Sequence, residues 1–229
     1  MYTLRSVAIR MSPVNDRRAA AAPPRIRKTK TRDLMLQAAG RILQRDGYAR
    51  LTMEGVAAES GMAKTTLYRR WPTKAALCMD MYLDVAGREV HDPDTGDVAR
   101  DLEHIADTVV RLQTRTVAGP AFIGLIAEAQ VNPGTRAAFL AEFADRRREV
   151  TRRVLTRAID RGELRKDTDV DLVIDALGGA TTFRLLQGHA PLTPKFTRAL
   201  VALLLSGCRS SEERPSKPVA KTKRGKNQR

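Results

Sequence analysis

The apolar residues of this chain recur at intervals of three and four residues over most of its length. The longest regular run follows Val98, where Leu102, Ile105, Val109 and Leu112 come four and three residues apart. This spacing places the apolar side chains on one face of a helix. Similar runs predict further helices at about residues 31–45, 73–90, 122–131, 135–161, 168–188 and 193–207. Together with two short helices between residues 52 and 71, the pattern predicts an all-α protein of about nine helices.

Turn and capping residues predict where these helices begin and end. Asp46-Gly47 is expected to end the first helix, and Gly119-Pro120 to break the helix that starts near residue 98. Asn132-Pro133-Gly134 is expected to stop the next helix. Thr168, with Asp171 three residues on, has the spacing of a capping box, and Thr193-Pro194 has the cap-then-proline order of a helix start.

Residues 51–77 are organised differently, as a short helix, a glycine turn and a basic second helix. Thr52 is expected to cap the first of these helices, because the first backbone N–H groups of a helix have no partner within it. Ser60-Gly61 predicts a turn, since glycine adopts the positive φ that a sharp reversal needs. Two helices joined by such a turn form a helix-turn-helix.

The second of these short helices has one apolar side. Leu67 and Trp71 lie four residues apart and are expected to anchor it. Between Gly61 and Met79 there are four basic residues and no acidic one. A basic helix is often only a solvated face. Here the charges are mixed with Thr and Tyr on two helical turns that follow a tight turn, as an element that reads the DNA major groove requires.

The charge of the chain is concentrated near its ends. The net charge is +15, and residues 1–30 hold eight Lys or Arg against one acid. Residues 207–229 hold eight against two, whereas residues 91–206 hold 16 of each. Residues 1–28 are therefore predicted to form a disordered basic arm, and residues 208–229 a disordered basic tail. The basic run from Arg25 to Arg32 is expected to lie along DNA phosphates, with a solubilising role as the alternative.

The composition argues against several other classes of protein. Two cysteines, Cys78 and Cys208, are too few for a disulfide framework and favour a reducing, cytoplasmic location. No apolar run approaches the ~20 residues that span a bilayer, so no membrane partner is expected. His91, His104 and His189 do not have metal-ligand spacing, and there is no glycine-rich phosphate loop. No enzyme activity, metal or cofactor is therefore expected.

The stretch TTLYRRWPTKAAL at residues 65–77 resembles the DNA-binding domain of the tetracycline-repressor (TetR) family, in particular its AcrR-like subgroup. The resemblance is strong from residue 31 to about 90. It implies a DNA-binding domain at residues 29–90 and a ligand-binding and dimerisation domain at residues 91–207. Ala63 stands where a capping serine is common, which departs from the family pattern. The candidate DNA contacts are Arg27, Lys28, Lys30, Thr52, Lys64, Thr65, Thr66, Tyr68, Arg69, Arg70 and Lys74, with Lys74 on a backbone phosphate.

By the same resemblance, the second domain is expected to hold a small apolar or amphipathic effector among its middle helices. Glu128, Arg184 and His189 are polar groups that interrupt apolar helices. Each also has a structural interpretation, because buried Glu and Arg often pair and a lone His is more often structural than a ligand contact. Arg146–Arg148 are expected to form a solvated face that pairs with nearby acids. The candidate ligand contacts are Met81, Tyr82, Leu102, Ile105, Phe122, Ile126, Glu128, Phe143, Phe183 and Arg184.

The last two predicted helices are strongly apolar and adjacent, which indicates a homodimer in which each chain contributes two helices to a four-helix bundle. The alternative is that they pack only within one chain. The candidate dimer contacts are Ile174, Leu177, Gly178, Thr181, Leu200 and Leu204.

These patterns together favour a dimeric regulator of transcription, with a repressor as the expected form. Its partners are expected to be double-stranded DNA carrying an inverted repeat, and a small-molecule effector that releases it. An architectural DNA-binding protein without an effector is the main alternative, and an enzyme on a helical scaffold is a weaker one.

Overall fold

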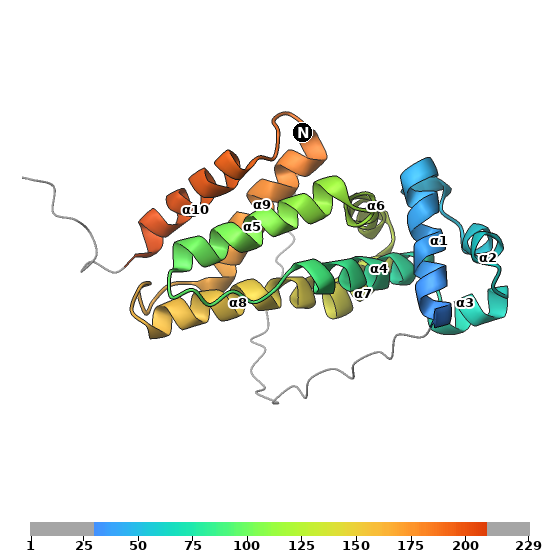
Figure 1. The fold of residues 1–229 in the computed structure, drawn as a ribbon, viewed down its shortest axis with the longest axis horizontal. Helices are drawn as coiled ribbons and strands as arrows, with labels where there is room; N and C mark the ends of the chain where they lie inside the picture. Colours follow the sequence, from blue (N-terminus) through green and yellow to red (C-terminus); the bar gives the residue numbers. More distant parts are fainter. Residues whose placement is uncertain (1–29, 210–229) are drawn as a thin grey trace, which may run out of the picture.

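The computed structural model describes residues 30–209, and the regular elements of that range are helices (Figure 1). The expected all-α fold is confirmed. The predicted N-terminal arm, with Arg27 and Lys28, and the tail from residue 210 lie outside the described residues. In chain order the elements are α1 (Lys30–Asp46), η1 (Tyr48–Arg50), α2 (Met53–Ser60), α3 (Lys64–Arg70), α4 (Lys74–Glu89), α5 (Val98–Arg115), α6 (Ala118–Val131), α7 (Pro133–Ala138), η2 (Phe139–Ala144), α8 (Asp145–Asp160), α9 (Val170–Gln187) and α10 (Pro194–Cys208).

The helices form a small head and a longer body. α1, α2 and α3 gather at one end of the molecule, and α4 leads from them into the body (Figure 1). In the body, α4, α5 and α8 run along the long axis, and α9 and α10 lie toward the end remote from the head (Figure 1). α4 packs mainly on α6, and α10 on α5. This arrangement holds α3 at the outer end of the molecule.

The capping residues of the head act as the sequence predicts. The Thr52 hydroxyl accepts a hydrogen bond from the Gly55 amide at 3.0 Å and starts α2. Gly61 ends α2 with φ of 68°, a left-handed conformation that glycine adopts at little cost. The Thr73 hydroxyl accepts from the Ala76 amide at 3.1 Å and starts α4. α3 begins at Ala63 without a side-chain cap, as expected from the missing serine.

Several helix boundaries in the body differ from the predicted ones. Gly119 and Pro120 do not break a helix but lie in the first turn of α6, where proline is tolerated because its missing N–H has no intrahelical partner. Asn132 ends α6 and also caps α7, with its side-chain oxygen accepting from the Thr135 amide at 3.1 Å. α7, a π-helical turn (η2) and α8 therefore replace the single predicted helix over residues 135–161. Asp169, rather than Thr168, caps α9.

Two clusters of buried apolar residues hold the described part of the chain together. The first joins the head to α4, α6 and Phe143 of η2, and includes Leu67, Leu77 and Phe122. The second joins α5, α8, α9 and α10 around residues such as Leu102 and Val201. α4 therefore belongs to the same core as both the head and α6.

A buried ion pair fixes α1 to α4. Arg32 is only 4% exposed, and its guanidinium donates to Asp80 at 2.7 Å and to Asp84 at 2.9 Å. The indole N–H of Trp71 donates to the same Asp80 carboxylate at 3.0 Å, which fixes the C-terminal end of α3. The basic run of the sequence suggested a phosphate contact for Arg32, and this interpretation is wrong. Arg32 belongs to the internal frame of the head.

Candidate nucleic-acid interface

α3 has one buried side and one exposed side. Leu67 is fully buried, and Trp71, which follows the helix, is 3% exposed. These two residues anchor α3 in the head, as predicted. Tyr68 is 44% exposed. Lys64, Thr65, Arg69 and Arg70 are also exposed, and Thr66 is half-buried.

The first turn of α2 contacts the exposed side of α3. Glu54 accepts a hydrogen bond from the Tyr68 hydroxyl at 3.1 Å and lies 4.0 Å from the Lys64 ammonium. Hydrogen bonds from the Glu54 backbone N–H and from the Tyr68 hydroxyl lower the pKa of the Glu54 carboxyl. The hydrogen bond between Tyr68 and Glu54 also raises the pKa of the Tyr68 hydroxyl. Both groups therefore keep their ordinary charge at neutral pH. Glu54 is therefore an acidic group beside two of the candidate DNA contacts.

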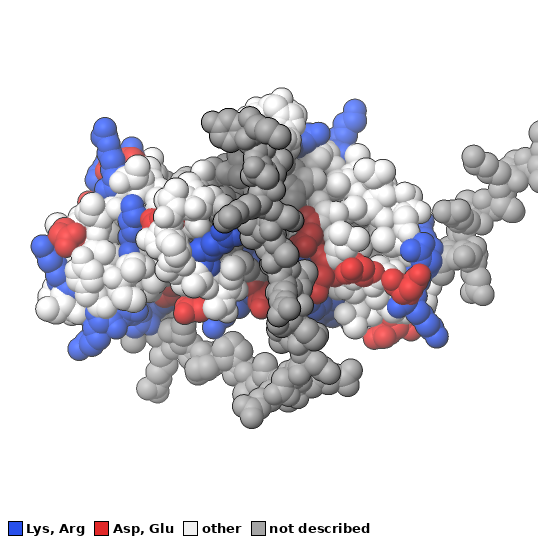
Figure 2. Space-filling view, turned by 180° about the vertical axis from the view of Figure 1, so that it is seen from behind, with Lys and Arg blue, Asp and Glu red and all other residues white. Residues whose placement is uncertain are grey.

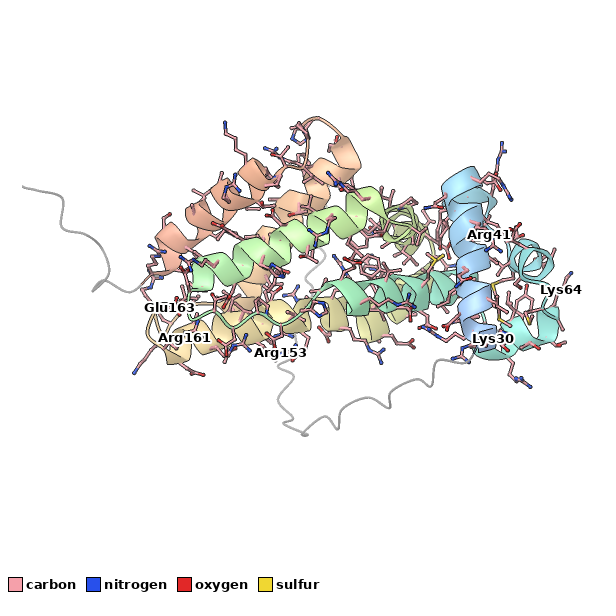
Figure 3. The ribbon with its side chains drawn as sticks, in the orientation of Figure 1. Lys30, Arg41, Lys64, Arg153, Arg161 and Glu163 are labelled. Carbon is pink, nitrogen blue, oxygen red and sulfur yellow. The ribbon has the colours of Figure 1, made fainter. Side chains whose placement is uncertain are left out.

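The start of α1 lies beside the C-terminal half of α3. A hollow of 190 Å³ is lined by Thr31, Arg32 and Met35 of α1 and by Thr66, Arg69 and Arg70 of α3. Lys30, the first described residue, is exposed at this edge, and Figure 3 shows Lys30 and Lys64 at the outer end of the molecule. Arg70 also lies over the Trp71 ring, 5.5 Å from its centroid. The start of α1 therefore lies next to the basic C-terminal end of α3.

Two candidate DNA contacts have structural partners in the head. The Thr52 side chain is exposed but its hydroxyl is the cap of α2. The Lys74 ammonium lies 4.6 Å from the centre of the Tyr48 ring and 3.9 Å from the Glu128 carboxylate of α6. Its side chain is 29% exposed. Lys74 thus starts α4 immediately after α3, between the candidate DNA surface and the body.

The opposite end of the molecule has a mixed charge pattern. Arg153 and Arg157 of α8 bind Asp92 at 2.7 Å, and Arg161 binds Glu163 at 2.6 Å. Figure 3 places Arg153, Arg161 and Glu163 far from the head, and Figure 2 shows Lys and Arg interleaved with Asp and Glu at that end. These arginines are neutralised by adjacent acids. The basic side chains of α3 are therefore the better candidates for DNA contacts.

Comparison with known proteins decides the family. Residues 35–80 match the family described as "Bacterial regulatory proteins, tetR family", and residues 92–204 match "Tetracyclin repressor-like, C-terminal domain". The chain belongs to the TetR family. It is a TetR-family transcriptional regulator rather than an enzyme, with an N-terminal DNA-binding domain and a C-terminal ligand-binding domain.

Individual relatives agree with this assignment. The DNA-binding transcriptional repressor TetR of Mycobacteroides abscessus is 34% identical, over 73% of this chain and 87% of that protein. The HTH-type transcriptional regulator Rv1556 of Mycobacterium tuberculosis is 31% identical, over 70% of this chain and 79% of that protein. The crystal structure of the TetR-family regulator SCO0332 is 37% identical, with a TM-score of 0.68 over 78% of this chain and 98% of that chain. No helix within residues 30–209 of this TetR-family chain combines the length and apolarity needed to cross a bilayer.

In this TetR-family chain, part of the predicted ligand set lies together in the core. Tyr82, Phe122 and Phe143 form an aromatic cluster, in which the Tyr82 and Phe143 ring centres are 5.1 Å apart. Met81 is buried in the same cluster and Ile126 is half-buried against it. Leu102 and Ile105 belong to the second core, and Ile105 lines a cavity of 430 Å³.

The other predicted ligand residues lie elsewhere. Phe183 is 59% exposed, and its ring is 5.3 Å from that of the exposed His189. The Arg184 guanidinium stacks 3.9 Å from the centre of the Phe196 ring and donates to a backbone carbonyl, that of Pro191. The prediction that Phe183 and Arg184 line the ligand cavity is therefore wrong. They belong to the outer side of α9, which the apolar pattern of this helix did not separate from the inner side.

Glu128 is a contact between the head and the body rather than part of a cavity. It accepts a hydrogen bond from the Tyr48 hydroxyl at 2.9 Å and from the Thr135 hydroxyl at 2.8 Å. The Tyr48 ring lies directly on the α6 backbone, since a Cβ atom added at Gly124 would be 2.0 Å from it. Burial raises the pKa of the Tyr48 hydroxyl well above its usual range, so it remains a donor.

The structure also corrects three of the predicted dimer contacts. Ile174 and Leu177 are each 7% exposed, and Thr181 is 5% exposed, because they face the core of their own chain. Gly178 is exposed and lines the 430 Å³ cavity. Leu200 and Leu204 are half-buried against the second core. The large exposed apolar side chains of α9 and α10 are instead Leu172, Phe183, Leu186 and Leu203.

One functional candidate was missed in the sequence. Within the run Arg146–Arg148, Arg148 pairs with Asp171 at 3.0 Å and with Asp175, as a solvated face predicts. Arg147 does not follow this prediction. Its guanidinium lies 4.1 Å from the centre of the Phe122 ring, and its buried Nε has no hydrogen-bond partner among the described residues. Three consecutive arginines gave no signal that one of them turns inward.

Proposed function

We propose that this TetR-family regulator is a dimeric repressor that binds an inverted-repeat operator and is released by a small-molecule effector. The observation that carries the proposal is the orientation of α3. Its apolar anchor Leu67 is fully buried, while Lys64, Tyr68 and Arg70 project outward from the end of the molecule. A short basic helix presented in this way fits the DNA major groove.

The side chains of α3 suggest which bases they read. Lys64 and Arg70 suit the O6 and N7 acceptors of guanine, and Thr66 and Tyr68 suit thymine methyl groups or phosphates. Lys74, directly after α3, suits a backbone phosphate. One helix of this length touches too few base pairs for useful discrimination. A twofold dimer places two such helices ~34 Å apart on one side of the duplex, which requires an inverted repeat.

The exposed apolar side of α9 and α10 supports the dimer. On α9 this side is formed by Leu172, Phe183 and Leu186, and on α10 by Leu203. Leu172, Phe183 and Leu203 are 64%, 59% and 69% exposed in the single chain. Large apolar side chains gathered on adjacent helices mark a protein interface. Two copies joined here form a four-helix bundle.

The contact at Glu128 supports a route from the effector to the DNA surface. Glu128 belongs to α6 of the body, and it meets Tyr48 of the head and Lys74, the first residue after the turn that follows α3. An effector that favours a different position of α6 would move these partners. It would then shift the population toward a head spacing that does not match the operator, by as much as its affinity differs between the two states.

Footprinting of the DNA adjacent to the gene tests the DNA part of the proposal. Protection of one discrete inverted repeat is expected, whereas uniform coverage would indicate an architectural protein and refute the repressor. Arg70→Ala is expected to weaken operator binding by about 5- to 150-fold, equivalent to ~1–3 kcal/mol. Arg41→Ala is the matched control, because Arg41 is exposed on α1 and pairs with Glu59 at 2.8 Å.

Sedimentation velocity tests the dimer separately. The wild-type protein is expected to sediment as a dimer at micromolar concentration, and Phe183→Asp as a monomer that loses operator binding. Leu140→Asp is the control, since Leu140 is 57% exposed and lies on η2 rather than on α9 or α10. A monomeric wild type would refute the dimer, and a dimeric Phe183→Asp variant would refute this face.

A further inference from the structure

Two adjacent cavities lie in the body between α5, α8 and their neighbours. The larger, of 430 Å³, is lined by α5, η2, α8 and α9, and the smaller, of 300 Å³, by α4, α5 and α8. Both are lined by Ile105 and Val109 of α5 and by Arg147 and Thr151 of α8. Volumes of this order accommodate small organic ligands. Arg147 stands at the boundary between the two spaces.

The lining of the larger cavity is mainly apolar. Ile105, Val109, Phe139 and Leu177 contribute aliphatic and aromatic side chains. Gly178 and Gly179 also line it, and a Cβ atom added at Gly178 would meet nothing within 4 Å. The glycine pair therefore leaves open space within the described chain, which suits the apolar part of a ligand.

Arg147 brings an incompletely satisfied positive charge to this apolar space. Its guanidinium faces three aromatic rings, at 4.1 Å from the centre of Phe122 and 5.4 Å from that of Tyr82. Its Nε is buried and has no hydrogen-bond partner within residues 30–209. The neighbouring arginines differ, since Arg148 binds Asp171 and Asp175, and Arg152 binds Asp171 at 2.9 Å. The acidic residues on this side of α9, Asp171 and Asp175, are therefore already paired with other arginines.

Gln113 is a second polar group on the same cavity without a partner. It lies on α5, is 4% exposed, and its side-chain oxygen has no hydrogen-bond partner among the described residues. Leaving a buried polar atom unsatisfied costs free energy, so such groups usually pair with protein, water or a ligand. The other charged residues of the lining are Arg148 and Asp175, which bind each other. With Arg147 included, the lining carries one net positive charge.

We infer that this cavity binds a small amphipathic molecule with a single carboxylate group. The carboxylate accepts hydrogen bonds from the Arg147 guanidinium, the Gln113 side-chain oxygen accepts one from a hydrogen-bond donor elsewhere on the ligand, and the apolar part lies along Ile105, Val109 and Leu177. A charge-assisted hydrogen bond inside a cavity is stronger than one in water, and an arginine fork suits the two oxygens of a carboxylate. This inference rests on the proposed function, because it specifies the chemistry of the effector.

Isothermal titration calorimetry on the full-length protein tests the inference with four probes. Decanoate and naphthalene-2-carboxylate are the acids, and 1-decanol and 2-naphthalenemethanol are the uncharged counterparts of similar shape. At least one acid is expected to bind at least tenfold more tightly than its alcohol. This comparison uses the unmodified protein and does not depend on the folding of a variant.

Two variants then assign the selectivity to Arg147. Arg147→Met keeps the apolar stem over the aromatic rings and is expected to weaken binding of the acid at least tenfold, leaving the alcohol unchanged. Arg147→Lys keeps the charge and is expected to retain a preference for the acid. Arg152→Met is the matched control, because Arg152 lies on the same helix and does not line either cavity. It is expected to bind the acid as the wild type does.

Equal affinity for acid and alcohol, an unaffected Arg147→Met variant, or no binding of either acid would overturn the inference. With any of these results, the proposed function as a DNA-binding repressor still stands if the same protein preparation protects a discrete operator in footprinting. Loss of the footprint without any probe would instead refute the proposed function, so the two failures are distinguishable.

Discussion

Replacing Arg32 with methionine removes the charge from the ion pair between α1 and α4 and keeps a side chain of similar length. Asp80 and Asp84 then lose the guanidinium that donates to them at 2.7 and 2.9 Å. The side chains of the three residues are 5%, 19% and 11% exposed. Water therefore has limited access to the two carboxylates, and the lost contacts are poorly replaced.

The expected loss of stability follows from this burial. Removing one partner of a buried ion pair costs about 3–5 kcal/mol. Asp80 keeps the Trp71 indole and Asp84 keeps Arg88 at 2.5 Å, which favours the lower end of this range. For a protein of this size, 3 kcal/mol corresponds to a decrease of ~6–12 °C in Tm. Arg41→Met is the control, since it breaks an exposed pair and costs about 0–1 kcal/mol.

Thermal and urea unfolding, followed by far-UV circular dichroism, measure this difference. Operator binding is expected to fall with stability, because the end of α3 is anchored through Trp71 to the same Asp80 carboxylate. The reasoning would be refuted if Arg32→Met kept the wild-type Tm and only weakened operator binding. That result would assign Arg32 to a DNA phosphate, as the basic run in the sequence suggested.

Three further predictions concern the head, α4 and α6. Glu128→Gln weakens the 2.9 Å hydrogen bond from the Tyr48 hydroxyl, and the free energy of unfolding is expected to fall by ~1 kcal/mol. In calorimetry this corresponds to a decrease of about 2–4 °C in Tm. An unchanged Tm would show that this contact does not stabilise the protein. Gly124→Ala places a Cβ atom 2.0 Å from the Tyr48 ring and is expected to destabilise the protein by ~1–3 kcal/mol. Gly87→Ala is the control, because a Cβ atom there meets nothing within 4 Å and alanine favours the helix, so this variant is expected to be more stable than the wild type. Equal changes of the two variants in urea unfolding would refute the close approach of Tyr48 to Gly124. Burial raises the pKa of the Cys78 thiol to about 12. Iodoacetamide at pH 8 is therefore expected to label Cys78 only in unfolded protein, as measured by mass spectrometry. Equally rapid labelling of the folded protein would contradict the burial of Cys78.

The head was predictable from the sequence because its determinants act over short distances. The caps at Thr52 and Thr73 each bond three residues ahead, and Gly61 determines the turn through its own φ. The anchoring of α3 by Leu67 and Trp71 follows from a four-residue spacing. None of these features depends on a distant part of the chain.

The missed features depend on distant residues or on the rotation of a helix about its axis. Arg32 bonds to residues 48 and 52 positions away, and nothing in its local sequence separates it from a solvated arginine. The direction of Arg147 depends on the rotation of α8, which follows the π-helical turn of η2. On α9, apolar residues occupy two sides, so Leu177 and Phe183 could not be assigned to the inner and outer side by periodicity alone.

The first core cluster has a consequence for recombining regulators. Because Met81 and Tyr82 of α4 are buried in the same cluster as Phe122 of α6, a fragment that ends at residue 90 leaves the apolar surface of α4 uncovered. Transplanting only that fragment onto a foreign sensor module would therefore create an aggregation-prone hybrid. A viable chimera has to carry over α6 as well, together with the Tyr48, Gly124 and Glu128 contacts that join it to the head.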